Sequence, residues 1–391
     1  MIERPAATNA SFDIIVIGVG SMGAPACYYL AKKGYKVLGL EQFDITHELG
    51  SHAGQSRIIR KAYFEHPDYV PLLQRAYANW DSLEKETGEQ IYHQAGLIYL
   101  GQPDSEMLKG VKRSAALYDI PLTIFDKSSA QERFPSFKIP GNFEALFEPD
   151  AGFLTPEKAI RLYAEQARKK GAEIHTNEKV IKWNKEGNHI IVSTDKDTYR
   201  CDKLIISAGA WSAKMIPHLS EKIKITRQFV AWVKPKKWKE FALNNFPCWL
   251  LADDERPGCY YGFPVLPEGL ADGPVGLKLA HHYPGAECDP DAVNRQTNAD
   301  EFENLRYVLD KYLPGAFESV IATKTCLYSN TPDENFVIDK LPGFEDHVIV
   351  ACGFSGHGFK FASVIGEILA GLATEGVTKL PIGFLRATRF A

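Results

Sequence analysis

A glycine-rich turn between two apolar runs near the start of the chain limits the fold more than any other feature. The run Ile14–Ile17 leads into the turn 18–23, which reads Gly-Val-Gly-Ser-Met-Gly, and a helix-like segment follows. A second apolar run, 36–40, then ends in Glu41, 23 residues after Gly18. This order predicts a strand, a glycine turn, a helix and a second strand that carries an acid at its tip.

The residue types in this turn suit a dinucleotide. Gly18 permits the tight turn, Gly20 lets backbone N–H groups approach a pyrophosphate, and Gly23 lets the helix pack closely on the strand. The helix N-terminus faces the phosphates, and the acid can accept hydrogen bonds from both ribose hydroxyls. A glycine turn in an ordinary α/β core would leave the acid without a role. We therefore predict an adenine dinucleotide site that includes Gly18, Gly20, Ser21, Met22, Gly23 and Glu41.

Composition excludes several classes of protein. A chain of 391 residues exceeds what one core usually supports, so two domains are expected. The net charge of −4, from 45 Lys+Arg and 49 Asp+Glu, argues against a nucleic-acid partner. No stretch approaches the ~20 apolar residues of a membrane span, and residues 1–11 lack the apolar core of a signal, which predicts a soluble, cytoplasmic protein. Seven cysteines without a CxxC pair predict reduced thiols and no metal site.

The order of segment types predicts an α/β fold in which one Rossmann-like domain is interrupted twice. The strand at 203–207 runs into a small-residue turn, and the strand at 347–352 opens a glycine-rich helix start, so each returns to the first domain. Between them we expect an α+β domain on a mainly antiparallel sheet. The predicted bounds are 12–90, 151–222 and 321–391 for the dinucleotide domain, 91–150 and 223–320 for the second domain, and 1–11 for a loose tail.

Hydrophobic periodicity and end signals place the main helices and strands. One helix begins with Thr155 as cap and Pro156 at its first position. The predicted helices are 69–86, 105–118, 156–170, 300–312 and 359–374. The predicted strands are 97–100, 144–147, 172–175, 229–233, 260–263 and 276–281.

Two arginines, Arg57 and Arg60, follow a loop of small polar residues close to the dinucleotide turn. Their spacing lets both face an anionic ligand. On composition alone, a role as surface or phosphate-neutralising residues explains them equally well.

Four segments point to a particular family more specifically than the glycine turn does. In chain order they are Gly-Ser-His at 50–52 with Arg-Ile-Ile-Arg at 57–60, Tyr-Tyr-Gly-Phe-Pro at 260–264, Pro-Asp-Glu-Asn-Phe at 332–336 and Gly-Phe-Ser-Gly-His-Gly-Phe-Lys-Phe at 353–361. They resemble the monomeric sarcosine oxidase and N-methyltryptophan oxidase family, flavin amine oxidases related to D-amino-acid oxidase. The resemblance covers nearly the whole chain. It implies bound FAD, oxidation of the C–N bond of an N-methyl amino acid to an imine, hydrolysis of that imine, and passage of two electrons to O2 to give H2O2.

The resemblance also implies roles for individual cations. Arg60 and Lys360 match the pair that binds the substrate carboxylate, since a guanidinium suits a planar carboxylate and a lysine adds a point charge. Arg57 matches a cation near the flavin ring. Lys278 matches the lysine that promotes O2 reduction, because a fixed cation stabilises superoxide. The alternative for Lys360 is a lysine on a helix surface.

Tyr261 and His282 match the aromatic walls that hold the amine, the alternative for His282 being a satisfied core histidine. Cys326 matches the cysteine that bonds covalently to the flavin 8α position, although a free cysteine is more commonly a small buried hydrophobe. These matches make Lys278, His282, Tyr261 and Arg57 the catalytic candidates. The further cofactor contacts implied are Ser51, Arg57, Val180, Gly209, Cys326, Gly353, Gly356, Gly358 and Lys360.

Two departures from the family pattern affect the expected substrate. The segment 265–274 is longer than usual, and Phe64-Glu65-His66 replaces a flexible Gly-Glu-Gly entrance loop. Sarcosine is the first substrate to consider, with N-methyltryptophan or a cyclic amino acid such as pipecolate as alternatives. A flavin dehydrogenase with another acceptor, or a nucleotide-binding regulator without turnover, are different classes. A monomer is expected.

Overall fold

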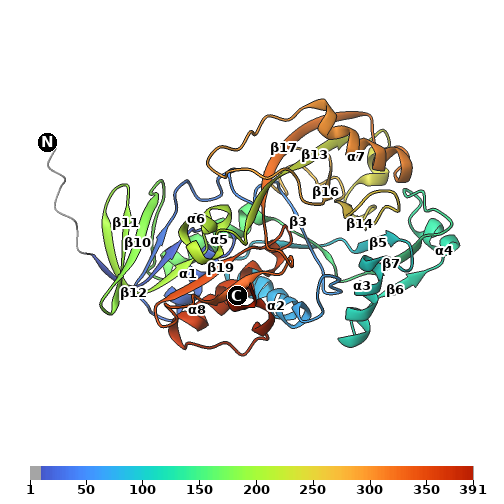
Figure 1. The fold of residues 1–391 in the computed structure, drawn as a ribbon. Coiled ribbons are helices and arrows are strands. Elements are labelled where there is room, and N and C mark those ends of the chain that lie inside the picture. Colours follow the sequence, from blue (N-terminus) through green and yellow to red (C-terminus); the bar gives the residue numbers. More distant parts are fainter. Residues whose placement is uncertain (1–9, 391) are drawn as a thin grey trace. The chain divides into compact units, whose positions relative to one another are not determined.

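The computed structural model describes residues 10–390, which divide into two compact units (Figure 1). Unit 1 comprises residues 10–53, 157–226 and 327–390 of the described chain, and unit 2 comprises residues 54–156 and 227–326. The first part of the predicted tail lies outside the described residues, and Ser11 already belongs to the first strand.

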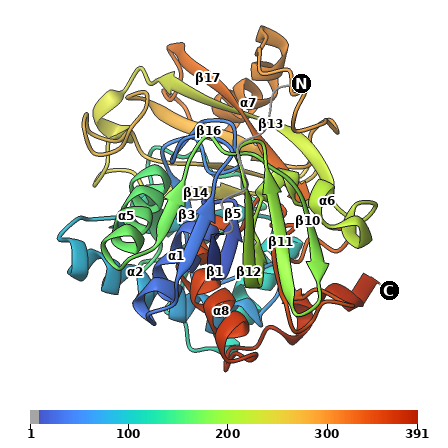
Figure 2. The same ribbon diagram turned by 90° about the vertical axis from the view of Figure 1, so that its left-hand side faces the viewer.

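Unit 1 is built on an eight-stranded mixed sheet, with strands in the order β10-β11-β12-β1-β2-β9 and with β19 pairing both β12 and β18. Figure 2 shows β10, β11 and β12 side by side at one end of this sheet. The strands are β1 (Ser11–Ile17), β2 (Val37–Leu40), β9 (Glu173–His175), β10 (Val180–Glu186), β11 (His189–Thr194), β12 (Thr198–Ile206), β18 (Val337–Lys340) and β19 (Val348–Cys352).

Parallel pairing explains why β1 reads as a continuous apolar run. β1 pairs in parallel with β12 on one side and β2 on the other, and Ile14–Ile17 are buried. A strand covered on both faces needs apolar residues throughout rather than alternation. The predicted strand, glycine turn, helix and second strand are confirmed by β1, α1 (Gly23–Lys32) and β2.

Helices α1 and α8 (Ala362–Thr374) pack against each other and on the same sheet (Figure 2). Gly366 makes this contact possible, because a Cβ there would lie 2.5 Å from Pro25 Cβ and 2.8 Å from the backbone nitrogen of Ala26. The other helices of unit 1 are α5 (Pro156–Lys169), α6 (Ser212–Met215) and the 3-10 turns Gly209–Trp211, Pro217–Leu219, Phe359–Phe361, Gly383–Leu385 and Ala387–Phe390.

Unit 2 contains a second eight-stranded sheet in the order β17-β13-β16-β15-β14-β5-β7-β6. The pairing of β14 with β5 is parallel, whereas β13–β16, β15–β16, β14–β15, β5–β7 and β6–β7 are antiparallel. The sheet is therefore mixed, and these pairings are mainly antiparallel, as the sequence analysis expected. The strands are β5 (Leu97–Gly101), β6 (Thr123–Phe125), β7 (Glu144–Glu148), β13 (Lys224–Lys234), β14 (Cys248–Leu251), β15 (Cys259–Gly262), β16 (Leu277–His282) and β17 (Ser319–Asn330).

The helices of unit 2 begin and end where local chemistry places them. Ser105 caps α3 (Glu106–Leu117) by accepting a 3.3 Å hydrogen bond from the Leu108 backbone N–H. Asn298 and Glu301 form a capping box at the start of α7 (Ala299–Tyr312). The remaining helices are α2 (Tyr69–Thr87), α4 (Lys127–Arg133) and the 3-10 turn Trp238–Phe241.

Segment 54–90, which the sequence analysis assigned to the dinucleotide domain, groups with unit 2. Strand β3 (Arg57–Ile59) pairs with β8 (Gly152–Leu154), and β4 (Tyr92–Gln94) pairs with the other side of β8. The Glu148 carboxylate also accepts hydrogen bonds from the backbone N–H groups of Lys61, at 2.6 Å, and Ala62, at 3.2 Å. These contacts join residues that lie far apart in the sequence, 87 positions for Lys61 and Glu148, so composition gives no sign of them. Over residues 10–390, no helix is long and apolar enough to cross a membrane.

We predict that Gly366→Ala lowers stability by about 1–2 kcal/mol, because the new methyl group must push α1 away from α8 and this cost exceeds the helix-propensity gain. Gly383→Ala is the control, since a Cβ there meets nothing within 4 Å. Thermal unfolding of both variants checks the prediction, and equal melting temperatures would contradict it.

Candidate active site

The glycine turn of unit 1 has the geometry that a dinucleotide requires. Gly18 has φ +85°, and a Cβ on it would lie 2.6 Å from the Ser207 carbonyl oxygen. A Cβ on Gly23 would lie 1.8 Å from the Gly18 carbonyl oxygen, whereas one on Gly20 would meet nothing within 4 Å. Gly18 and Gly23 therefore make the turn and the helix contact, and Gly20 leaves open space beside the backbone.

Glu41 follows β2 with its carboxylate turned back to this turn. One oxygen accepts a 2.9 Å hydrogen bond from the Val19 N–H, and the other accepts a 3.1 Å bond from the Phe43 N–H. The side chain is buried at 5% exposure. Burial raises the pKa of Glu41 to about 7, although the backbone N–H groups oppose the shift. A ligand that donates hydroxyl hydrogen bonds would favour the ionised form further.

A second glycine turn in unit 1 connects β19 to α8. Gly353 has φ +65° and Gly356 has φ +78°. A Cβ on Gly356 would lie 2.3 Å from the Tyr328 ring, and one on Gly358 would lie 2.6 Å from Phe354 Cβ. The turn is therefore shaped by close contacts at each of these positions.

Lys360 lies in the 3-10 turn that follows and is buried, with 6% exposure. Its Nζ donates a 2.7 Å hydrogen bond to the His357 carbonyl oxygen. This burial excludes the alternative of a lysine on a helix surface.

The other predicted cofactor contacts of unit 1 lie at the ends of its elements. Ser21 and Met22 are the last residues of the turn before α1, Val180 begins β10, and Gly209, with φ +54°, begins a 3-10 turn after β12. Ser51 is exposed in the loop after β2.

Lys278 of β16 is the most enclosed cation of the predicted set in unit 2, with 2% exposure. Its Nζ donates to the carbonyl oxygens of Gly54 and Ser56, the latter at 2.7 Å, and lies 3.2 Å from Ser56 Oγ. The ammonium also stands 4.6 Å from the centre of the Phe263 ring. Neutral oxygens and a ring face thus hold a buried charge.

Arg57 and Cys326 belong to the same region of unit 2. A Cβ on Gly54 would lie 3.4 Å from Arg57 Nη1 and 3.8 Å from Lys278 Nζ, so both cations converge there. Cys326 is buried, and burial raises the pKa of its thiol, whereas Arg57 and Lys278 act to lower it. The structure therefore brings together three residues that the sequence analysis selected from distant positions.

Arg60 is buried at 3% exposure and already has a carboxylate partner. Its Nη2 donates to both carboxylate oxygens of Glu65, at 2.7 and 2.8 Å, and the guanidinium lies over the Tyr63 and Phe64 rings. Burial alone would lower the pKa of Arg60, and the Glu65 carboxylate more than offsets this and raises it. The surface role is thus excluded for Arg60, and the residue has the environment of an anion binder.

Tyr261 and His282 lie on one face of the β15–β16 hairpin. Tyr261 pairs with Ala280 and Cys259 with His282, so Tyr261, His282 and Lys278 point to the same face. Val230, Trp232 and Ala280 form a buried cluster there, and Tyr261 packs against it. We refer to this as the front face of the hairpin.

Comparison with known proteins agrees with this geometry. Residues 13–372 match the family model described as FAD dependent oxidoreductase. The chain belongs to the FAD-dependent oxidoreductase family. It is 38% identical to monomeric sarcosine oxidase of Streptomyces avermitilis, over 98% of this chain and 99% of the relative. It is 36% identical to N-methyl-L-tryptophan oxidase of Salmonella dublin, over 97% and 99%.

A solved structure of NikD, an unusual amino acid oxidase essential for nikkomycin biosynthesis, shares the fold with a TM-score of 0.83. That likeness spans 96% of this chain and 97% of NikD at 22% identity. The residues of unit 1 fit the FAD of this oxidoreductase family. The open space at Gly20 admits a pyrophosphate, and the buried Glu41 carboxylate can accept from ribose hydroxyls.

The partners of the two buried cations were not predicted from the sequence. Ser56 and the Gly54 carbonyl bind Lys278, and Glu65, which the sequence analysis named only as part of the entrance segment, binds Arg60. Glu65 lies five positions after Arg60, a spacing that a search for local ion pairs would have found. The two oxygens at 54 and 56 are backbone atoms, for which no residue type gives a signal.

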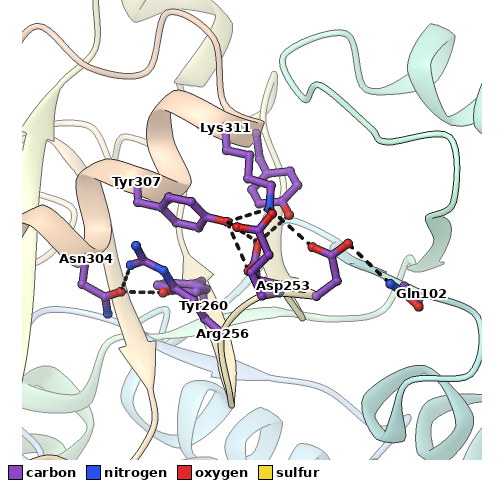
Figure 3. A network of polar contacts seen from close by, with 10 residues as sticks. Gln102, Asp253, Arg256, Tyr260, Asn304, Tyr307 and Lys311 are labelled. Carbon is purple, nitrogen blue, oxygen red and sulfur yellow. Dashed lines mark hydrogen bonds and ion pairs between the residues drawn. The ribbon is translucent and has the colours of Figure 1, made fainter.

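The back face of the β15–β16 hairpin packs on α7 through a polar network (Figure 3). Asn304 Oδ1 accepts from the Tyr260 hydroxyl at 2.6 Å and also from Arg256, while Asn304 Nδ2 lies 3.0 Å from His281 Nδ1. His281 Nε2 lies 2.8 Å from the Pro257 carbonyl oxygen. The imidazole therefore donates through Nε2 and accepts through Nδ1, and burial lowers its pKa.

Asp253 anchors the other half of this network. Lys311 donates to it at 3.0 Å, and the hydroxyls of Tyr307 and Tyr312 also donate to its carboxylate. Burial acts to raise the pKa of Asp253, but the donors together hold it below its ordinary value. The loop between β14 and β15 is thereby tied to α7.

We predict that Asp253→Asn lowers the free energy of unfolding by about 2 kcal/mol at pH 7, the scale of a lost charged hydrogen bond. Because the folded-state pKa is lowered, this stabilisation is present above the ordinary carboxyl range and is lost as pH falls through the folded pKa. Urea titrations from pH 7 downward should show the difference shrink in acid. Asp254→Asn is the control, since Asp254 is more exposed and lies 3.4 Å from Lys311, and a loss as large as that of Asp253→Asn would contradict the assignment.

Proposed function

We propose that this oxidoreductase is an FAD-dependent oxidase of N-methyl amino acids, with sarcosine as the first substrate to test. The observation that carries the proposal is the convergence of Arg57 and the buried Lys278 beside Cys326, in a chain 38% identical to a protein named monomeric sarcosine oxidase. The reaction consumes sarcosine, O2 and water and yields glycine, formaldehyde and H2O2. A cytoplasmic monomer is part of the same proposal.

Each candidate residue of unit 2 has a role in the proposed reaction. Bound FAD supplies the two-electron acceptor. Tyr261 and His282 form the aromatic walls that hold the amine, and Arg57 is the cation beside the ring. Lys278 stabilises the anion that forms as O2 takes its first electron, because it is a fixed cation and the oxygens of Ser56 that hold it are neutral.

The substrate carboxylate binds Arg60 and Lys360 in this proposal. Arg60 already holds a carboxylate, so its fork has the shape and the surroundings for one. An incoming carboxylate replaces Glu65 or shares the guanidinium with it. Lys360, buried in unit 1, adds the second charge.

N-methyl-L-tryptophan is the second candidate substrate, because relatives named N-methyl-L-tryptophan oxidase are 36% identical over 97% of this chain. Anaerobic titration with sarcosine, N-methyl-L-tryptophan and pipecolate, followed by admission of air, tests the function. The oxidase should lose its visible colour with the true substrate and recover it in air, with equal yields of H2O2 and formaldehyde for an N-methyl substrate. Recovery only with an added acceptor would mean a dehydrogenase, and no loss of colour with any amino acid would reject the proposal.

For the carboxylate site we predict that Glu65→Gln tightens the binding of acetate about tenfold, since it removes the charged competitor at Arg60. The double variant Arg60→Met with Glu65→Gln should lose most acetate binding and leave no carboxylate unpaired. Perturbation of the visible spectrum by acetate measures both. Wild-type affinity in the double variant would place the carboxylate site elsewhere.

We also predict covalent attachment of FAD through Cys326. The thiolate would add to the electrophilic 8-methylene tautomer of the flavin, which would leave the flavin reduced for O2 to reoxidise. Arg57 and Lys278 favour ionisation of the thiol against the effect of burial. After acid precipitation, yellow colour should stay in the wild-type pellet and appear in the supernatant for Cys326→Ala. Cys248→Ala is the control, being another buried free cysteine of unit 2. Complete release of FAD from the wild type would refute the linkage.

A further inference from the structure

Two backbone carbonyls on either side of a single residue hold the Lys278 ammonium. The carbonyl oxygens of Gly54 and Ser56 accept from Nζ, together with Ser56 Oγ at 3.2 Å. Three oxygens match the three N–H bonds of an ammonium. A buried charge is costly without such partners, so the position of this cation depends on the conformation of the residue between them, Gln55.

Gln55 has a conformation that only a few non-glycine residues adopt. Its φ is +73°, and the Ser56 N–H donates a 2.8 Å hydrogen bond back to the Gly54 carbonyl oxygen. A positive φ with a bond between residues two apart defines the γ-turn of the rare, strained kind. Strain of this sort persists only where the surroundings enforce it, and it is concentrated at functional sites.

The Gln55 side chain supplies that enforcement. It is 3% exposed, its Oε1 accepts a 2.7 Å hydrogen bond from Trp232 Nε1, and its Nε2 donates a 3.1 Å bond to the Pro274 carbonyl oxygen. Trp232 is the cross-strand neighbour of Lys278 in the β13–β16 pair. The amide therefore links the γ-turn to the strand next to the lysine.

Pro274 belongs to segment 265–274, which the sequence analysis identified as longer than usual. The segment lies directly against the turn, because a Cβ on Gly273, where φ is +142°, would be 3.3 Å from Gln55 Cβ. Segment 265–274 thus contacts the turn that holds Lys278.

We propose that Gln55 is a positioning residue for Lys278: it holds the 54–56 turn in the shape that binds the ammonium and couples that shape to segment 265–274. The consequence for O2 rests on the proposed oxidase function, whereas the positioning itself does not. Loss of the Gln55 side chain lets the turn relax to an unstrained conformation. The ammonium then loses acceptors and moves away from its site.

The first test is the chemical reactivity of Lys278 in the full-length protein as isolated. Gln55→Ala should raise the rate of acetylation of Lys278 by acetic anhydride, followed by mass spectrometry, by about tenfold, the equivalent of one lost hydrogen bond. Gln55→Gly, which relieves the φ strain, is a second variant in case the alanine variant folds poorly. Gln131→Ala is the matched control, because the Gln131 amide also makes two hydrogen bonds, to Phe137 and Ile139, within unit 2.

The second test separates the positioning from the function. With whichever amino acid reduces the flavin in the anaerobic titration, Gln55→Ala should slow reoxidation by O2 about tenfold and change anaerobic reduction by less than about threefold. Lys278→Met, which removes the cation itself, should slow reoxidation in the same way, whereas Gln131→Ala should not. Lys278 reactivity equal to that of the wild type in both Gln55 variants overturns the proposal. Raised reactivity with unchanged reoxidation supports the positioning of Lys278 and rejects its role towards O2.

Discussion

Burial of positive charge is the constraint on which unit 2 depends, and the chain meets it in two ways. Arg60 is paired with a carboxylate, so the charges of the two groups cancel. Lys278 donates to neutral oxygens of the 54–56 turn, and neutral acceptors do not cancel its charge. A fixed charge in a buried site acts on any anion that forms nearby. The two sites are thus suited to different tasks. The Lys278 site suits an anion that forms nearby, and the Arg60 site suits a carboxylate that can exchange with Glu65.

In unit 1 the constraint is space. Backbone atoms approach so closely at Gly18 and Gly23 that a side chain would overlap them, and this closeness brings the N-terminus of α1 to the end of β1. Glu41 completes the arrangement because its carboxylate is fixed by two backbone N–H groups before any ligand arrives. The same turn therefore shapes the phosphate region and orients the acid.

Features encoded by near neighbours in the chain were predictable from the sequence. The β1–α1–β2 unit, the helix predicted over 105–118 and the helix ending at Tyr312 depend on residues a few positions apart, and the structure has them where the patterns placed them, within a residue or so at their ends. Local patterns do not predict which residues from distant segments lie together. The family resemblance pointed to Arg57, Lys278 and Cys326, and the structure brings them together in unit 2.

The features that the sequence did not predict depend on backbone geometry and on pairing between segments far apart in the chain. Nothing in the residue Gln55 indicates a γ-turn, because glutamine has no preference for positive φ. The grouping of segment 54–90 with unit 2 follows from hydrogen bonds to Glu148, which a reading of composition does not detect. The parallel pairing of β5 with β14 is likewise a property of the assembled sheet.

The two faces of the β15–β16 hairpin make different contacts, because successive side chains of a strand point to opposite faces. Its back-face residues, Tyr260 and His281, are committed to Asn304 and α7, whereas its front-face residues, Tyr261 and His282, are not part of that network. Tyr261 and His282 can therefore be exchanged while the contacts of the back face with α7 stay the same. For enzyme engineering, this means that a library confined to positions 261 and 282 would vary the front face of the hairpin while Lys278 and the contacts of the back face with α7 are kept.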